Sequence, residues 1–164
     1  MLAETDPALV AALGAAVGPS RVAARPIDRI AWASDASFYR LVPQAVVHAA
    51  SAADAKALFA LSHARQIPLT FRAAGTSLSG QAVTDGILVE VARGMRRVVV
   101  EDRGARVRLQ PGVIGEHANR ALAPYGRKIG PDPASIATCA VSRTRATMLR
   151  PGSCCAIRPR RADS

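Results

Sequence analysis

The hydrophobic and polar positions follow two different periods along the chain. Apolar residues three or four positions apart predict three helices, over residues 7–17, 51–65 and 114–122. A fourth, shorter helix is expected over 29–36, with Asp28 as its cap. Short apolar and β-branched runs between turn-forming residues predict strands, over residues 44–48, 68–71, 86–91, 95–101 and 105–109. Residues 102–104 form the expected hairpin turn between the last two strands. This order predicts an α+β fold with a mixed sheet flanked by helices.

Two of these helices have recognisable N-terminal signals. Asp6 and Pro7 provide a cap and a first-turn proline for the helix over 7–17. Ser51 and Asp54 have the spacing of a capping box, with Asp in the position where Glu is commoner. These signals fix where the two helices are expected to begin.

A loop of small residues, 72–82, directly follows the predicted strand 68–71. It holds two glycines and three hydroxyl side chains and has no bulky group at its centre. Successive backbone N–H groups of such a loop can converge on one anion, and the hydroxyls add donors. A phosphate or pyrophosphate cradle is one interpretation, and a flexible Gly/Ser-rich connection is the other. Composition alone leaves both open.

The charge is uneven along the chain. The net charge is +10, and the last 23 residues hold six of the 22 basic residues and about half of that excess. Elsewhere the basic residues are scattered, Arg96-Arg97 and Arg127-Lys128 are the adjacent pairs, and no aromatic residues interleave with them. Only Lys56 and Lys128 are lysines, a bias that suggests GC-rich coding more than a phosphate-binding surface. We therefore do not expect a nucleic-acid partner.

Chain length, hydropathy and cysteine spacing indicate the broad class of protein. A length of 164 residues suits one domain of ordinary size. No apolar run is long enough to span a membrane, and the first residues lack the pattern of a secretory signal, so a cytoplasmic protein is expected. Cys139, Cys154 and Cys155 have no metal-ligand spacing with any histidine, and adjacent cysteines rarely pair, so neither a metal site nor a disulfide framework is expected.

Several motifs, in this order, carry a family resemblance. They are Ser34-Asp-Ala-Ser-Phe-Tyr-Arg40, Pro43-Gln-Ala-Val-Val47, Arg72-Ala-Ala-Gly-Thr-Ser-Leu-Ser-Gly-Gln81, Gly86-Ile-Leu-Val-Glu-Val91, Gln110-Pro-Gly112 and Gly130-Pro-Asp-Pro-Ala-Ser135. Together they resemble the first subdomain of the FAD-binding domain (the PCMH type) of the vanillyl-alcohol oxidase and para-cresol methylhydroxylase superfamily. Within it, the chain is most similar to the branch of D-lactate dehydrogenases and related FAD-dependent 2-hydroxy-acid dehydrogenases. The match covers roughly residues 28 to 141.

The resemblance implies a set of cofactor contacts. In the family, the Gly-Thr-Ser-Leu-Ser-Gly turn wraps the FAD pyrophosphate with backbone N–H groups. The matching residues here, with their neighbours, are Arg72, Gly75, Thr76, Ser77, Leu78, Ser79, Gly80 and Gln81. The proline-rich stretch resembles a second contact segment, which implies that Pro131, Asp132 and Ser135 line the flavin. Turn chemistry is the alternative for Asp132 and Ser135.

Other polar residues have no expected role in catalysis. Asp35, Tyr39 and Arg40 match the family pattern, but we expect them to serve packing and a surface ion pair. His48 and His63 are interpreted as structural or solvated, and His117 has no evident partner in the sequence. No catalytic residue is therefore assigned.

The resemblance breaks off after the proline-rich stretch. The family reads Gly-Gly and Asn-Asn in the next segment, whereas this chain has an arginine-rich one in which only Cys154-Cys155 matches. We hypothesise that the reading frame is shifted from about Ser142, which sequencing the coding DNA tests. The expected organisation is a helical lead-in (1–37), a partial FAD-binding domain (38–141) and a disordered tail (142–164).

The resemblance does not extend to the substrate domain that supplies the family's catalytic residues. A 2-hydroxy-acid substrate is therefore expected only in a full-length form, because the protein must position the substrate against the flavin. Three hypotheses remain: part of an FAD-dependent 2-hydroxy-acid dehydrogenase, an inactive fragment with weak or no FAD affinity, and a basic nucleic-acid-binding module. Bound flavin separates the first two, and salt-sensitive DNA binding tests the third.

Overall fold

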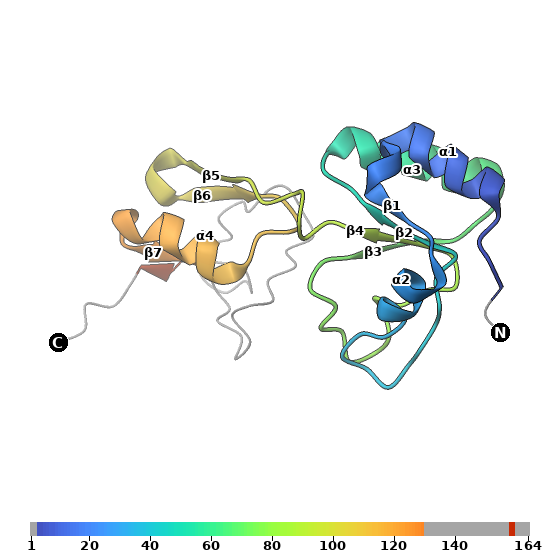
Figure 1. The fold of residues 1–164 in the computed structure, drawn as a ribbon. Helices are drawn as coiled ribbons and strands as arrows, with labels where there is room; N and C mark the ends of the chain where they lie inside the picture. Colours follow the sequence, from blue (N-terminus) through green and yellow to red (C-terminus); the bar gives the residue numbers. More distant parts are fainter. Residues whose placement is uncertain (1–2, 130–157, 160–164) are drawn as a thin grey trace. The chain divides into compact units, whose positions relative to one another are not determined.

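The chain forms two compact units, residues 1–94 and 95–164. The computed structural model describes residues 3–129 and 158–159 (Figure 1). The expected site residues Pro131, Asp132 and Ser135 lie outside this described part, as does the tail over 142–164 except for its two residues 158–159. Residues 1–37, expected as a helical lead-in, contribute helices and a strand to the first unit.

The first unit is built of helices and strands that alternate along the chain. They are α1 (Pro7–Val17), η1 (Pro19–Arg21), β1 (Val22–Ala23), α2 (Pro26–Ala31), β2 (Ala45–His48), α3 (Ala52–Arg65), β3 (Leu69–Arg72) and β4 (Ile87–Glu90). The predicted strands 44–48, 68–71 and 86–91 agree with β2, β3 and β4 to within a residue or two at each end. The two-residue strand β1 was not predicted, because two residues are too few to show a period.

The four strands form one sheet in the order β1-β2-β4-β3. β1 is antiparallel to β2, and β2, β4 and β3 are parallel, so the predicted mixed sheet is confirmed. The helices α1 and α3 lie together over one face of the sheet and α2 lies at the other (Figure 1). The side chains of Ala45–Val47 and Ile87–Val89 are fully buried between these layers. Because helices cover both faces of the sheet, β2 and β4 are buried on both sides, which explains why each is a continuous apolar run in the sequence.

The parallel strands end together at one edge of the sheet. Their register aligns His48 of β2 with Glu90 of β4, and Glu90 with Arg72 of β3. Three charged or titratable side chains thus occupy the last position of three adjacent strands. The loops that follow these strands therefore begin side by side, which is the usual location of ligand sites in parallel sheets.

The capping box at the start of α3 is confirmed. The Ser51 hydroxyl accepts a hydrogen bond from the Asp54 amide, and the Asp54 carboxylate accepts from the Ser51 amide. Asp54 also accepts from the Ala50 amide at 2.8 Å and pairs with Arg21 of η1 at 2.5 Å. Burial alone raises the pKa of Asp54, but the Ala50 amide and Arg21 outweigh it and hold this pKa below its ordinary value.

Asp54→Asn is expected to lower the free energy of unfolding by about 1 kcal/mol at neutral pH, because it removes half of the cap and the Arg21 pair. The folded pKa of Asp54 is lowered, so this contribution is present above the ordinary carboxyl pKa. The difference between variant and wild type should shrink as the pH falls through the folded pKa. Urea unfolding between pH 7 and pH 3 measures it, and Asp85→Asn, an exposed change of equal charge, is the control. An unchanged difference at the acid end contradicts the assignment.

The predicted bounds of the helix over 29–36 are wrong. The structure places α2 at Pro26–Ala31, with Pro26 in its first turn. Asp28 does not cap this helix; its carboxylate pairs with the Arg25 guanidinium at 2.7 Å. The fixed φ of proline favours the first helical turn, so the helix starts earlier than the apolar pattern indicated. The chain leaves the helix at Trp32 and enters the loop 33–42.

The second unit contains a β-hairpin and a short helix. Its described elements are β5 (Val98–Glu101), η2 (Asp102–Gly104), β6 (Arg106–Leu109), α4 (Gly115–Leu122), η3 (Ala123–Tyr125), β7 (Arg127–Lys128) and β8 (Arg158–Pro159). The antiparallel pairing of β5 with β6 confirms the predicted hairpin and its turn. Val107, Leu109, Val113, Ala118 and Leu122 form a small buried core. β7 pairs antiparallel with β8.

Candidate functional site: the loop after β3

The loop over residues 72–82 leaves the carboxyl edge of the parallel sheet at the end of β3. Two glycines within it have left-handed backbone conformations, Gly75 with φ of 68° and Gly80 with φ of 69°. A Cβ atom on Gly75 would lie 2.5 Å from the Arg72 guanidinium, and one on Gly80 would lie 2.6 Å from the Tyr39 ring. Both positions therefore require glycine for backbone conformation and for space.

The centre of the loop presents hydrogen-bond donors. The amides of Ser79 and Gln81 both donate to the Ser77 hydroxyl oxygen, each at 3.2 Å, which shows that they point toward one locus. Within the described residues, the backbone amides of Thr76, Leu78 and Gly80 have no protein acceptor. Amides without acceptors, grouped over a few residues, are typical of loops that bind anions.

Arg72 connects the start of the loop to the segment after α2. Its guanidinium donates to the Trp32 carbonyl at 3.2 Å and lies over the Trp32 ring, 5.1 Å from the ring centroid. Burial lowers the pKa of Arg72 and the nearby Asp35 carboxylate opposes this effect, yet a guanidinium stays charged at any physiological pH. A positive charge is therefore held at the base of the loop.

Asp35 and its neighbours contact the loop from outside. The Asp35 carboxylate accepts from the Ser37 hydroxyl and amide through one oxygen, and from the Ala82 amide through the other at 3.3 Å. The Ala36 amide donates to the Gly75 carbonyl at 3.0 Å. The Ser37 hydroxyl, with the two amides and Arg72, holds the pKa of Asp35 below its ordinary value against the opposing effect of burial.

The expected roles of the Asp35 region need correction. Asp35 makes hydrogen bonds to Ser37 and Ala82, and neither Asp35 nor Arg40 has an ion pair within the described residues. Tyr39 does pack, since its ring lies against Gly80, although 52% of the residue is exposed. The surface ion pair stays a prediction for Arg40, whereas the Asp35-x-Ser37 spacing gives the Asp35 carboxylate local donors. This Asp-x-Ser spacing is the feature of the sequence that could have predicted the hydrogen bonds between Ser37 and Asp35.

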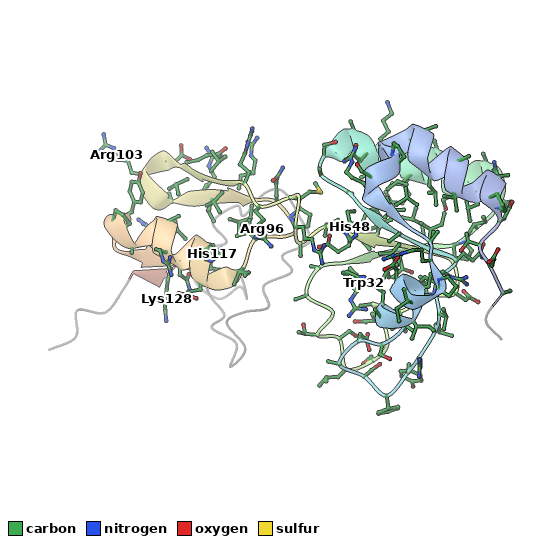
Figure 2. The ribbon with its side chains drawn as sticks, in the orientation of Figure 1. Trp32, His48, Arg96, Arg103, His117 and Lys128 are labelled. Carbon is green, nitrogen blue, oxygen red and sulfur yellow. The ribbon has the colours of Figure 1, made fainter. Side chains whose placement is uncertain are left out.

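A second polar group lies at the ends of β2 and β4, where Glu90 is aligned with Arg72 at the start of the loop. Glu90 is only 1% exposed, and its carboxylate contacts His48 Nδ1 at 2.9 Å and accepts from the Arg93 amide at 2.9 Å. The His48 ring makes an edge contact with Trp32 at 5.9 Å between centroids (Figure 2). His48 is therefore structural, as expected. The contacts of Glu90 and Trp32 were not predicted from the sequence. For Glu90, the position of a charged residue at the end of an apolar strand could have indicated a buried polar contact.

The structure brings eight of the predicted site residues together in one loop. They are Arg72, Gly75, Thr76, Ser77, Leu78, Ser79, Gly80 and Gln81. The hydroxyls of Thr76 and Ser79 have no protein partner in the described part of the chain, and Leu78 is 75% exposed. Pro131, Asp132 and Ser135 lie outside the described residues, so their predicted place beside the flavin stays a prediction.

Comparison with known proteins identifies the kind of domain. Residues 43–145, which include the whole loop, match the family described as FAD binding domain. The chain belongs to this FAD-binding family. The resemblance in the sequence motifs is thereby confirmed, and FAD is the cofactor of the family. The two positive-φ glycines and the amides without acceptors fit the diphosphate of such a cofactor, which needs many donors and close approach to the backbone.

Curated relatives in this family act on 2-hydroxy acids according to their names. The chain is 36% identical over 109 residues to D-2-hydroxyglutarate dehydrogenase of Escherichia coli K12, covering 64% of this chain and 11% of that protein. It is 35% identical over 107 residues to the glycolate oxidase subunit GlcD of the same strain, covering 64% and 21%. The chain thus spans only a tenth to a fifth of the length of these relatives.

Solved structures with the same fold include alkyldihydroxyacetonephosphate synthase, with a TM-score of 0.70 and 20% identity, covering 82% of this chain and 30% of that one. P-cresol methylhydroxylase matches with a TM-score of 0.58 and 13% identity, covering 78% and 27%. At these identities the similarity establishes the fold alone, which is that of the FAD-binding domain expected from the sequence. Among the described residues, no helix is long and apolar enough to cross a bilayer, and no three potential metal ligands are grouped.

Proposed function

We propose that this chain is the diphosphate-binding part of an FAD-dependent oxidoreductase that acts on a 2-hydroxy acid. The observation that carries the proposal is the loop 72–82, whose amides at Thr76, Leu78 and Gly80 have no protein acceptor within the described residues. In the proposed complex, these amides and that of Ser77 donate to the two phosphates. The membership of the chain in the FAD-binding family supports FAD as the ligand.

The side chains of the loop add to this role. The hydroxyls of Thr76 and Ser79 supply further donors, and the Arg72 guanidinium supplies the positive charge at the base of the loop. Gln81, whose side-chain oxygen accepts from the Ser77 hydroxyl at 3.2 Å, orients that hydroxyl. Pro131, Asp132 and Ser135 remain the proposed contacts to the flavin. When bound, FAD supplies the redox chemistry, as the acceptor of two electrons from the substrate.

A 2-hydroxy acid is the proposed substrate class of a full-length protein that contains this chain. The names of the two relatives, which share about 35% identity with it, support this class. The described residues hold the cofactor end of the site only, so we assign no catalytic residue. The cytoplasmic location expected from the sequence is part of the same proposal.

The purified chain is expected to bind FAD with one saturable site. Trp32 is the single tryptophan and lies against Arg72 at the base of the loop, so its fluorescence should be quenched on binding. ADP, which carries the diphosphate, should compete, whereas riboflavin, which lacks it, should not. No saturable quenching by FAD, or equal competition by riboflavin, contradicts the proposed role of the loop.

The substrate class needs a separate experiment on a full-length protein carrying this chain. Anaerobic addition of D-2-hydroxyglutarate, glycolate or D-lactate should bleach the visible absorbance of the bound flavin for at least one of these acids. Bleaching by none of them would reject the substrate class and leave the diphosphate site unaffected.

A further inference from the structure

We propose that Asp35 is a positioning residue for FAD: it holds the loop 72–82 in its binding conformation before the cofactor arrives. The inference rests on the proposed function of this loop in binding the diphosphate. In this proposal the Asp35 carboxylate acts through the loop and does not itself contact the cofactor. Asp35 lies outside the loop, in the segment between α2 and β2.

The contacts of Asp35 and Ala36 fix the loop near both of its ends. One Asp35 oxygen accepts from the Ala82 amide at 3.3 Å, at the last residue of the loop. The neighbouring Ala36 amide donates to the Gly75 carbonyl at 3.0 Å, near the first residues of the loop. The residues between these two points carry the amides that have no acceptor. The separation of those amides is therefore set by two adjacent residues of another segment.

Asp35 is itself held in place by Ser37. Its other oxygen accepts from the Ser37 amide at 2.9 Å and from the Ser37 hydroxyl at 2.5 Å. Both carboxylate oxygens are therefore engaged, and the side chain has little freedom to turn away from Ala82. A local Asx-type turn thus presents a fixed acceptor to the end of the loop.

Besides the hydrogen bonds of Ser77 with Ser79 and Gln81, the centre of the loop has few contacts that order it. Leu78 is 75% exposed, and the side chains at positions 76, 79 and 81 are also exposed, so the centre of the loop has no apolar anchor. A loop that must be ordered on binding loses affinity through conformational entropy, whereas one held in advance does not. Preorganisation by Asp35 is the physical reason to expect an effect on FAD affinity.

The charge of Asp35 strengthens the inference. A carboxylate near a dianionic ligand is electrostatically unfavourable, so its presence beside this loop requires a compensating benefit. Its charge is balanced here by three hydrogen-bond donors and by the nearby Arg72 guanidinium. The benefit that the contacts indicate is the fixed position of the Ala82 amide.

Asp35→Asn is the sharpest variant, because it keeps the shape of the side chain. A carboxamide has one acceptor oxygen, so in either orientation its NH2 group faces a donor, at Ala82 or at Ser37. Ser37→Ala is the second variant, which loosens Asp35 without touching its charge. Asp28→Asn is the matched control, because it removes the same charge at another site. Asp28 lies on α2, pairs with Arg25 and does not contact the loop.

The experiment titrates FAD and ADP into each variant of the whole chain and follows Trp32 fluorescence. Asp35→Asn is expected to weaken both ligands by the same factor, about tenfold, and Ser37→Ala by about threefold. Hydrogen exchange of the Ala82 amide should accelerate in both variants. Asp28→Asn should leave the two affinities and this exchange rate unchanged.

Two results overturn the inference while leaving the proposed function intact. One is wild-type affinity in both Asp35→Asn and Ser37→Ala. The other is an equal loss of affinity in Asp28→Asn, which would indicate a general effect on the fold, because removal of a negative charge alone favours an anionic ligand. If Asp35→Asn does not fold, Ser37→Ala decides the question alone. A wild-type chain that binds neither FAD nor ADP overturns the proposed function, and the role of Asp35 with it.

Discussion

Gly80→Ala is expected to weaken FAD binding by about 100-fold. Gly80 has φ of 69°, a conformation that costs an L-residue with a side chain about 1–2 kcal/mol. The added Cβ would also lie 2.6 Å from the Tyr39 ring, so either the ring or the loop must move. A shifted loop loses aligned amide donors, each worth about 1 kcal/mol.

The matched control for this variant is Gly126→Ala. Gly126 also has a left-handed backbone, with φ of 63°, but nothing lies within 4 Å of a Cβ placed there. It follows η3 in the second unit, away from the loop 72–82 in sequence. Gly126→Ala should lower stability by a similar 1–2 kcal/mol through its backbone strain and leave FAD affinity unchanged.

A double variant separates the two causes at Gly80. Removing the Tyr39 ring in the pair Gly80→Ala, Tyr39→Ala relieves the steric contact and leaves the backbone strain. FAD affinity should then recover in part, measured by quenching of Trp32 fluorescence. Wild-type affinity in Gly80→Ala alone would show that the loop does not approach the diphosphate through its backbone.

The sequence was sufficient to predict the parts of this fold that depend on local patterns. The two central parallel strands are apolar on both faces, so their runs at 45–47 and 87–89 were visible without tertiary information. The capping box at Ser51 and the hairpin turn at 102–104 are equally local signals, and the structure confirms both. The loop 72–82 was found because its composition is unusual and its family motif is specific.

What could not be predicted depends on contacts between distant segments. The hydrogen bond between Asp35 and the Ala82 amide joins residues 47 positions apart, and that between His48 and Glu90 joins residues 42 apart. Neither partner has a neighbour in sequence that reveals the pairing. The register of the parallel strands creates the contact of His48 with Glu90, by placing the last residues of β2, β4 and β3 side by side.

His48→Ala is expected to lower the free energy of unfolding of the first unit by about 3 kcal/mol or more. The variant removes His48 Nδ1 from the Glu90 carboxylate, which is 1% exposed and also accepts from the Arg93 amide at 2.9 Å. A buried charge that loses its partner costs more than the pair was worth, because it cannot regain its hydration. The variant also removes the ring that contacts Trp32.

Graded substitutions test whether the lost donor is the cause. His48→Asn keeps an N–H donor close to the position of Nδ1 and should recover part of the stability. Glu90→Gln removes the buried charge itself and should cost less than His48→Ala, about 1–2 kcal/mol. His63→Ala is the control, since His63 is an exposed histidine on α3, and should change stability by less than about 0.5 kcal/mol.

Urea unfolding followed by Trp32 fluorescence measures these differences in the unit that contains the site. Because His48→Ala changes the surroundings of Trp32 itself, circular dichroism must give the same midpoint before a two-state free energy is calculated. If His48→Ala and His63→Ala prove equally mild, the contact of His48 with Glu90 contributes nothing to stability. If Glu90→Gln proves the costlier change, the buried carboxylate is held mainly by the Arg93 amide, and His48 only covers it.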